Sequence, residues 1–171
     1  QRVVHVAHVD AHARGGVLVD VDVHLDAVFL LVGVHVGQRG LLLHLLGQAR
    51  ELYSYAARIE GRGNDEDKFA YLRDVRQYRN LLLVEQPNGD FARTMVRQFF
   101  YSVFADLYWR AMMNSKDATL AAIAAKSEKE SAYHVRHCSE WIVRLGDGTE
   151  ESHARAQEAM MESYMVGLKL R

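Results

Sequence analysis

Glutamate and histidine at helical spacing are the residues of this chain that could bind a metal or take part in redox chemistry. A di-iron carboxylate centre in a helical bundle uses one Glu from each of two helices and a Glu-x-x-His pair from each of two others. The chain contains one such pair, Glu150 and His153. It follows Gly148 at the start of an expected helix, where acidic residues stabilise the helix dipole. We therefore expect Glu150 and His153 to be helix-start residues and not metal ligands.

Glu130 and His134 form a second combination, four residues apart and so on one face of a helix. A dinuclear site needs more ligands than these two, and we interpret them as a polar, metal-free pseudo-site in the core. A buried carboxylate needs a hydrogen-bonding or cationic partner. His134 can be that partner locally, and Arg50 is the candidate from across the bundle. The sequence therefore predicts no catalytic residue, no metal and no cofactor in this chain.

The elements that position these residues follow from the apolar pattern after residue 44. Leu45 to Ile59 repeats apolar residues at spacings of three and four, which predicts a helix that is ended by Gly61, Gly63 and Asn64. Residues 65–80 predict a short charged helix. A longer helix has the apolar stripe Ala92, Val96, Phe99, Val103 and Leu107, and two more helices cover about 118–145 and the residues after Thr149. Helices of this length with short connections predict an antiparallel helical bundle.

The connection before the longer helix is the clearest turn signal. Pro87 fixes φ, Gly89 permits a positive φ, and Asp90 is a good helix N-cap. We expect Pro87, Asn88, Gly89 and Asp90 to form a structural turn with no catalytic role. Asp117 and Thr149 are expected to cap the two helices that follow.

Composition excludes several classes of protein. The net charge is −1, with 49% hydrophobic and 25% charged residues, which argues against a nucleic-acid or anionic-membrane partner. The longest apolar run near the start, 27–34, is far below the ~20 residues that span a bilayer. One cysteine, Cys138, excludes an internal disulfide and favours the cytoplasm. We expect Cys138 to be a buried, inert thiol. Tyr108 and Trp109 are candidates for partner-facing side chains, since Tyr and Trp are common in interfaces.

Residues 1–43 differ in composition from the rest of the chain. They are rich in Val and His and have a period-two pattern, and one hypothesis is a wrong reading frame of GC-rich DNA. A metal site at His5, His8, Asp10 and His12 fits no known spacing. We divide the chain into an atypical segment, 1–43, and a helical bundle domain, 44–171. We expect residues 1–40 not to pack as a bundle helix.

From about residue 45 to 158 the chain resembles the C subunits of bacterial phenylacetyl-CoA epoxidase. The most specific stretch runs from Asn80 through Leu81-Leu82-Leu83-Val84-Glu85-Gln86-Pro87-Asn88-Gly89-Asp90 to Ala92. Shorter matches are Leu45-Leu46-Gly47-Gln48-Ala49-Arg50, Arg73-Asp74-Val75-Arg76-Gln77-Tyr78 and Arg144-Leu145-Gly146-Asp147-Gly148-Thr149.

The resemblance implies a ferritin-like fold and a structural subunit that binds a homologous catalytic subunit. That partner would hold the di-iron centre and epoxidise the aromatic ring of phenylacetyl-CoA with dioxygen, in cytoplasmic phenylacetate breakdown. The family has an acidic residue where His44 stands, and its members continue past this chain, so we expect the bundle to be incomplete at both ends. The alternative is a catalytic di-iron oxygenase subunit, which the single Glu-x-x-His pair disfavours.

Overall fold

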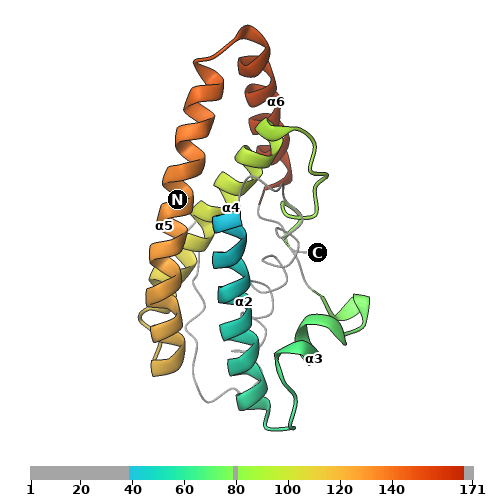
Figure 1. Cartoon of the computed structure of the whole chain (residues 1–171), viewed down its shortest axis with the longest axis vertical. Helices are drawn as coiled ribbons and strands as arrows, with labels where there is room; N and C mark the ends of the chain where they lie inside the picture. The colour runs from blue at the N-terminus through green and yellow to red at the C-terminus, as the bar shows by residue number, and fades with distance from the viewer. Residues whose placement is uncertain (1–38, 79–80, 168–171) are drawn as a thin grey trace.

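The computed structural model describes residues 39–78 and 81–167, which form five α-helices and one short 3-10 helix. In chain order they are α2 (Arg39–Glu60), α3 (Glu66–Tyr71), η2 (Val75–Gln77), α4 (Phe91–Met112), α5 (Ala118–Gly146) and α6 (Glu150–Val166) (Figure 1). Within these ranges there is no β-strand, so the predicted all-α class is confirmed. None of the described helices is both long enough and apolar enough to cross a membrane.

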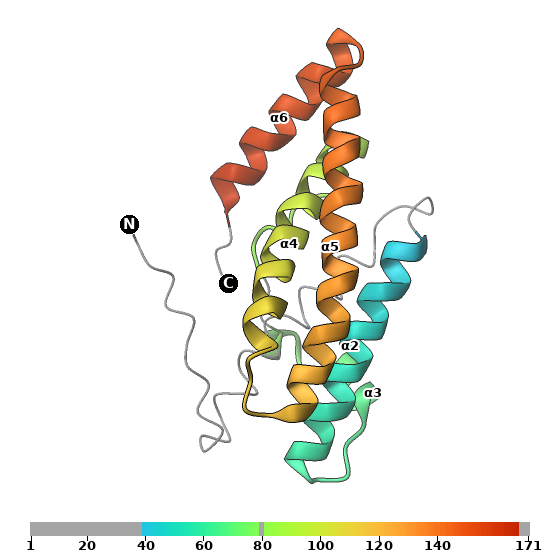
Figure 2. The same cartoon turned by 90° about the vertical axis from the view of Figure 1, so that its left-hand side faces the viewer.

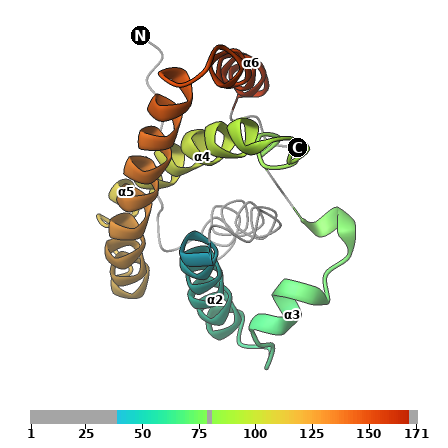
Figure 3. The ribbon, with the colours of Figure 1, turned by 45° about the horizontal axis from the view of Figure 1, so that its top comes forward.

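The helices pack as an antiparallel bundle around α5. Figure 2 shows α4 and α5 side by side along much of their length, with α6 folding back from the end of α5. α2 lies against α5, and Figure 3 shows that α2 and α6 lie on different sides of it. This arrangement is the antiparallel helical bundle that the apolar pattern predicts, and it is consistent with the ferritin-like fold that the resemblance implies.

Local sequence signals explain where the helices begin and end. Asp90, Asp117 and Thr149 are the N-caps of α4, α5 and α6, and each side chain accepts a hydrogen bond from a backbone N–H of the first turn. α2 ends at Glu60, directly before Gly61, whose φ is 67°. The predicted caps and the predicted helix end are therefore confirmed.

The buried face of α4 differs from the predicted one. Ala92 and Val96 are buried as expected, but Leu107 is 63% exposed, and Trp109 is buried instead. The buried line also includes the polar side chains of Gln98 and Ser102, which hydrogen-bond to each other. Because α4 is apolar over most of its circumference, its sequence does not single out one face.

The N-terminal domain boundary lies in a helix. α2 begins at Arg39, five residues before the expected start of the bundle domain at 44. The rest of the predicted atypical segment, and with it the early histidines, lies outside the described residues. The expectation that residues 1–40 do not pack as a bundle helix stays a prediction for residues 1–38.

Candidate functional site: a polar seam between two helices

A line of polar side chains joins α2 to α5. We call His44, Gln48, Glu130 and His134 the α2–α5 seam, because each of them bonds to a residue of the other helix. On each helix the two seam residues are four positions, about one helical turn, apart. Their partners on α5 follow in the reverse order of residue number, as in an antiparallel pair of helices. Farther along, Glu51 pairs with Lys126, and Tyr55 donates to Asp117. The seam therefore fixes the register of two antiparallel helices.

The first pair of the seam consists of two imidazoles. The Nδ1 atom of His44 lies 3.0 Å from the Nε2 atom of His134, and the ring planes are inclined by only 23°. His134 is 1% exposed. Burial first, and then the neighbouring His44 and His137, lower the pKa of His134 to about 4. His134 is therefore neutral at physiological pH.

The second pair places a carboxylate against an amide. The Nε2 atom of Gln48 donates to the Oε2 atom of Glu130 over 2.8 Å. Gln48 is 3% exposed, and its Oε1 atom has no hydrogen-bond partner among the described residues. Glu130 is half-buried, at the edge of the core. The predicted polar cluster of Glu130 and His134 thus lies between the helices, but each residue bonds to α2 and not to the other.

The prediction that Arg50 is the partner of Glu130 is wrong. Its side chain is 77% exposed and pairs with Glu66 of α3, with the Nε atom 3.3 Å from Oε1. On a helix, a position two residues after Gln48 points about half a turn away, so Arg50 cannot share the face that carries Gln48. His44 and Gln48 were missed as seam residues, although their spacing of four placed them on one face.

The donor set of the seam does not fit a di-iron centre. Such a centre needs four carboxylates and two histidines that converge from four helices, whereas the seam offers one carboxylate, bonded to Gln48, and two imidazoles bonded to each other. Residues 39–78 and 81–167 contain no group of three His, Cys, Asp or Glu side chains placed to hold a metal ion. No chemical step through iron is therefore assigned to these residues.

Glu150 and His153 lie at the start of α6, as predicted. Both side chains are exposed, and the Nδ1 atom of His153 lies 2.8 Å from the backbone oxygen of Gly146. That contact ties the first turn of α6 to the end of α5. The pair therefore has a structural position at the helix junction.

The turn that contains Pro87 is held by a buried arginine. The Nη1 atom of Arg97 donates to the backbone oxygens of Gln86 and Pro87, and Nη2 donates to Oδ1 of Asn88. Arg97 is 4% exposed, and burial lowers its pKa. Gly89 has a φ of 60°, as the turn requires. The turn is thus built by hydrogen bonds, and its lack of a catalytic role stays a prediction.

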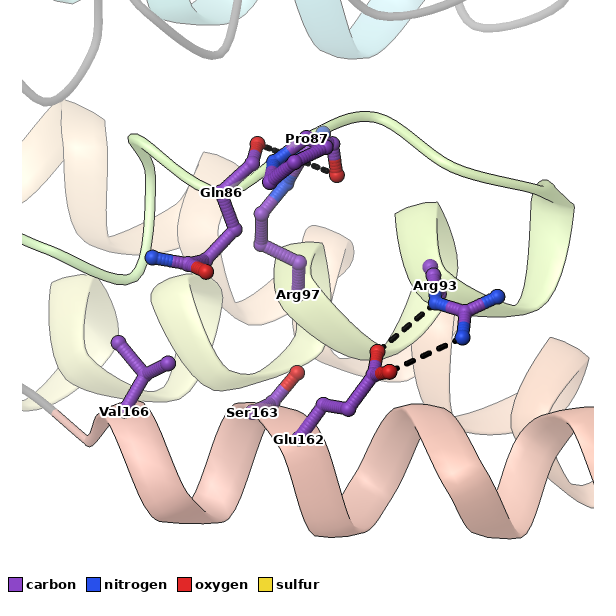
Figure 4. A pocket seen from close by; sticks show the side chains of 7 residues that line it. All are labelled: Gln86, Pro87, Arg93, Arg97, Glu162, Ser163 and Val166. Atoms are coloured by element: carbon purple, nitrogen blue, oxygen red, sulfur yellow. Dashed lines mark hydrogen bonds and ion pairs between the residues drawn. The ribbon is translucent and has the colours of Figure 1, made fainter.

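A cavity of about 390 Å³ lies beside this turn, between α4 and α6 (Figure 4). Figure 4 shows the guanidinium of Arg93 paired with the carboxylate of Glu162 at its edge. The Nε atom of Arg93 lies 2.8 Å from the Oε2 atom of Glu162. The lining residues are Gln86, Pro87, Arg93, Arg97, Glu162, Ser163 and Val166. Arg93 belongs to α4 and Glu162 to α6, so their ion pair joins the two helices beside the cavity.

Two further residues are placed by the structure. Cys138 is fully buried, and burial raises the pKa of its thiol to about 12, as expected for an inert thiol. Trp109, a candidate for a partner-facing side chain, is 1% exposed and belongs to the core.

Comparison with known proteins places this bundle in a family. The sequence profile described as phenylacetic acid catabolic protein matches residues 39–170. Over 128 residues the chain is 51% identical to the C subunit of 1,2-phenylacetyl-CoA epoxidase from Escherichia coli (strain K12). That alignment covers 75% of this chain and 51% of the relative, so the chain spans about half the length of the curated relative it matches. The chain belongs to the phenylacetic acid catabolic protein family.

Proposed function

We propose that this chain is a structural, non-catalytic subunit of a multicomponent phenylacetyl-CoA epoxidase that acts in cytoplasmic phenylacetate catabolism. The observation that carries the proposal is the 51% identity to an epoxidase C subunit over 128 residues. About half of the relative's length lies outside the alignment, so we give the role of this chain in the complex as a proposal.

The donor set of the α2–α5 seam supports the non-catalytic half of this proposal. Where a di-iron enzyme of this architecture needs converging carboxylates, α2 contributes an imidazole and a neutral amide, His44 and Gln48. These side chains hydrogen-bond to His134 and Glu130, so the polar groups of the seam are paired with each other within the chain. We infer that a homologous catalytic subunit holds the di-iron centre and epoxidises the acyl-CoA.

The test is to express the full chain alone and together with a homologous catalytic subunit from the same source. We expect the two chains to copurify as a heteromer, with about two irons for each catalytic chain. The chain purified alone should carry less than stoichiometric iron, and phenylacetyl-CoA should be epoxidised only by the complex. About two irons in the chain alone would instead support a catalytic di-iron subunit. Failure to form a heteromer would contradict the structural role.

A further inference from the structure

The two imidazoles of the seam meet in the geometry of a shared proton. The ring centroids of His44 and His134 are 5.3 Å apart, and the facing nitrogens are 3.0 Å apart. This centroid separation is what results when one ring radius is added at each end of the N···N distance. The two nitrogens therefore lie close to the line between the ring centres, as in an N–H···N hydrogen bond between a donor and an acceptor imidazole.

Such a bond tolerates one extra proton but not two. With one added proton, an imidazolium can still donate to the neutral ring beside it. With two, both facing nitrogens carry hydrogen and neither can accept, so the bond is lost and two positive charges face each other. His44 is half-buried, whereas His134 is 1% exposed, so the second proton must enter the buried ring.

The surroundings do not compensate for that second charge. His44 and His137 both make the charged form of His134 less favourable, and the carboxylate of Glu130 is bonded to Gln48, one turn away. Arg97 is the buried charge of α4, and its guanidinium is held by the 86–88 turn. The other ring that meets the pair is that of Tyr133 on α5, which contacts both imidazoles edge-on and carries no charge to offset theirs.

The pair also lies at one end of the described polar links between α2 and α5. From His44 onward, the described polar links to α5 are Gln48–Glu130, Glu51–Lys126 and Tyr55–Asp117, all toward the C-terminal end of α2. Loss of the imidazole bond would therefore release the N-terminal turns of α2 first.

We propose that His44 and His134 form a proton-sensitive latch that holds the N-terminal half of α2 against α5 and opens when both imidazoles are protonated. The stabilisation is present above the ordinary histidine pKa of about 6.5. It is lost as the pH falls toward the lowered pKa of His134, about 4. The inference does not depend on the proposed enzyme complex, because it concerns a contact within this chain.

The test is hydrogen–deuterium exchange of the full chain at about pH 7 and about pH 4.5, with rates corrected for intrinsic exchange. Between pH 7 and pH 4.5, the equilibrium constant for local opening should rise on the order of tenfold to a hundredfold more in the N-terminal half of α2 than in α4. This ratio follows from the lowered pKa of His134. In His134→Gln, whose amide can bond to His44 without titrating, this difference should disappear. His153→Gln, at an exposed histidine of α6, should keep the wild-type response.

Carboxylates such as Glu130 are present in all three proteins, so the comparison isolates the imidazole pair. Equal changes in α2 and α4 of the wild type, or an unchanged response in His134→Gln, would overturn the proposal. If His134→Gln does not fold, nitrogen NMR of the histidine rings in the wild type decides. A His134 ring that stays neutral to below about pH 5 supports the latch, and one that titrates near its ordinary pKa of about 6.5 overturns it.

Discussion

Gln48 of α2 donates its amide to the carboxylate of Glu130 on α5, across 2.8 Å and 82 residues of chain. A neutral partner thus hydrogen-bonds to the carboxylate, and the nearby ammonium group of Lys126 interacts with it through space. The other end of the same amide, the Oε1 atom of Gln48, has no partner among the described donors. The contact therefore joins α2 to α5 through two polar side chains that are each other's hydrogen-bond partner.

Replacing Glu130 with alanine should lower the free energy of unfolding by about 1–2 kcal/mol, because the buried amide of Gln48 loses its acceptor. A buried charged partner left behind would make the loss larger, about 3 kcal/mol or more, but Gln48 is neutral. Urea unfolding measures the change. Replacing Gln48 and Glu130 together with leucine should recover part of the loss, since neither polar group is then left unpaired.

The matched control for this prediction is Glu51→Ala, which removes another α2–α5 pair. Glu51 and Lys126 are 42% and 58% exposed, so their ion pair is screened by solvent and its loss should cost less than about 1 kcal/mol. If Glu130→Ala unfolds at the wild-type urea concentration, the seam contributes nothing to the packing of α2.

Asp90→Ala should lower the free energy of unfolding by about 1 kcal/mol, the usual cost of losing an N-cap. The side chain accepts from the backbone N–H of Arg93, and its longer contacts to Arg93 and Arg155, 3.8 and 3.6 Å, are partly exposed and add little. Glu140→Ala, at an exposed position of α5, is the control and should stay within about 0.5 kcal/mol of the wild type. Complete loss of turnover in a folded, partner-bound Asp90→Ala complex would show that the turn has a direct chemical role.

Arg97→Lys should destabilise the protein by about 2–3 kcal/mol although it keeps the charge. An ammonium group cannot reach all three acceptors that the planar guanidinium holds, the oxygens of Gln86, Pro87 and Asn88. Arg93→Lys is the matched control, one turn away on α4. Its ion pairs with Glu158 and Glu162 are partly exposed, so it should change stability by less than about 1 kcal/mol. Equal effects of the two variants would show that Arg97 does not hold the turn.

Features set by neighbouring residues were predictable from the sequence. The caps Asp90, Asp117 and Thr149 and the end of α2 just before Gly61 each depend on a few consecutive residues, and all lie as predicted. The composition and the absence of interrupting prolines were sufficient for the helical class. These signals act within one turn of the chain, so no knowledge of the packing was needed.

Features set by packing were not predictable in the same way. The buried face of α4 was misassigned at Leu107 and Trp109, because an all-round apolar helix acquires its orientation from its neighbours. The partner of Glu130 was misassigned to Arg50, because charge alone favoured an arginine, whereas the helical face favours Gln48. A check of the i, i+4 spacing between His44 and Gln48 would have brought both into the seam.

Cys138 provides a test of whether the buried face of α5 opens as a unit. Its thiol is fully buried and its pKa is raised to about 12, so little reactive thiolate forms near neutral pH. Alkylation by iodoacetamide at about pH 8 should be on the order of a hundredfold or more slower in the native protein than in denaturant. Cys138→Ala should cost about 1 kcal/mol for lost packing, and Cys138→Ser should cost more, because a hydroxyl at this apolar position needs a hydrogen bond. Native alkylation as fast as in denaturant would mean that the buried face of α5 opens readily in solution, and that the burial of His134 on the same face is transient as well.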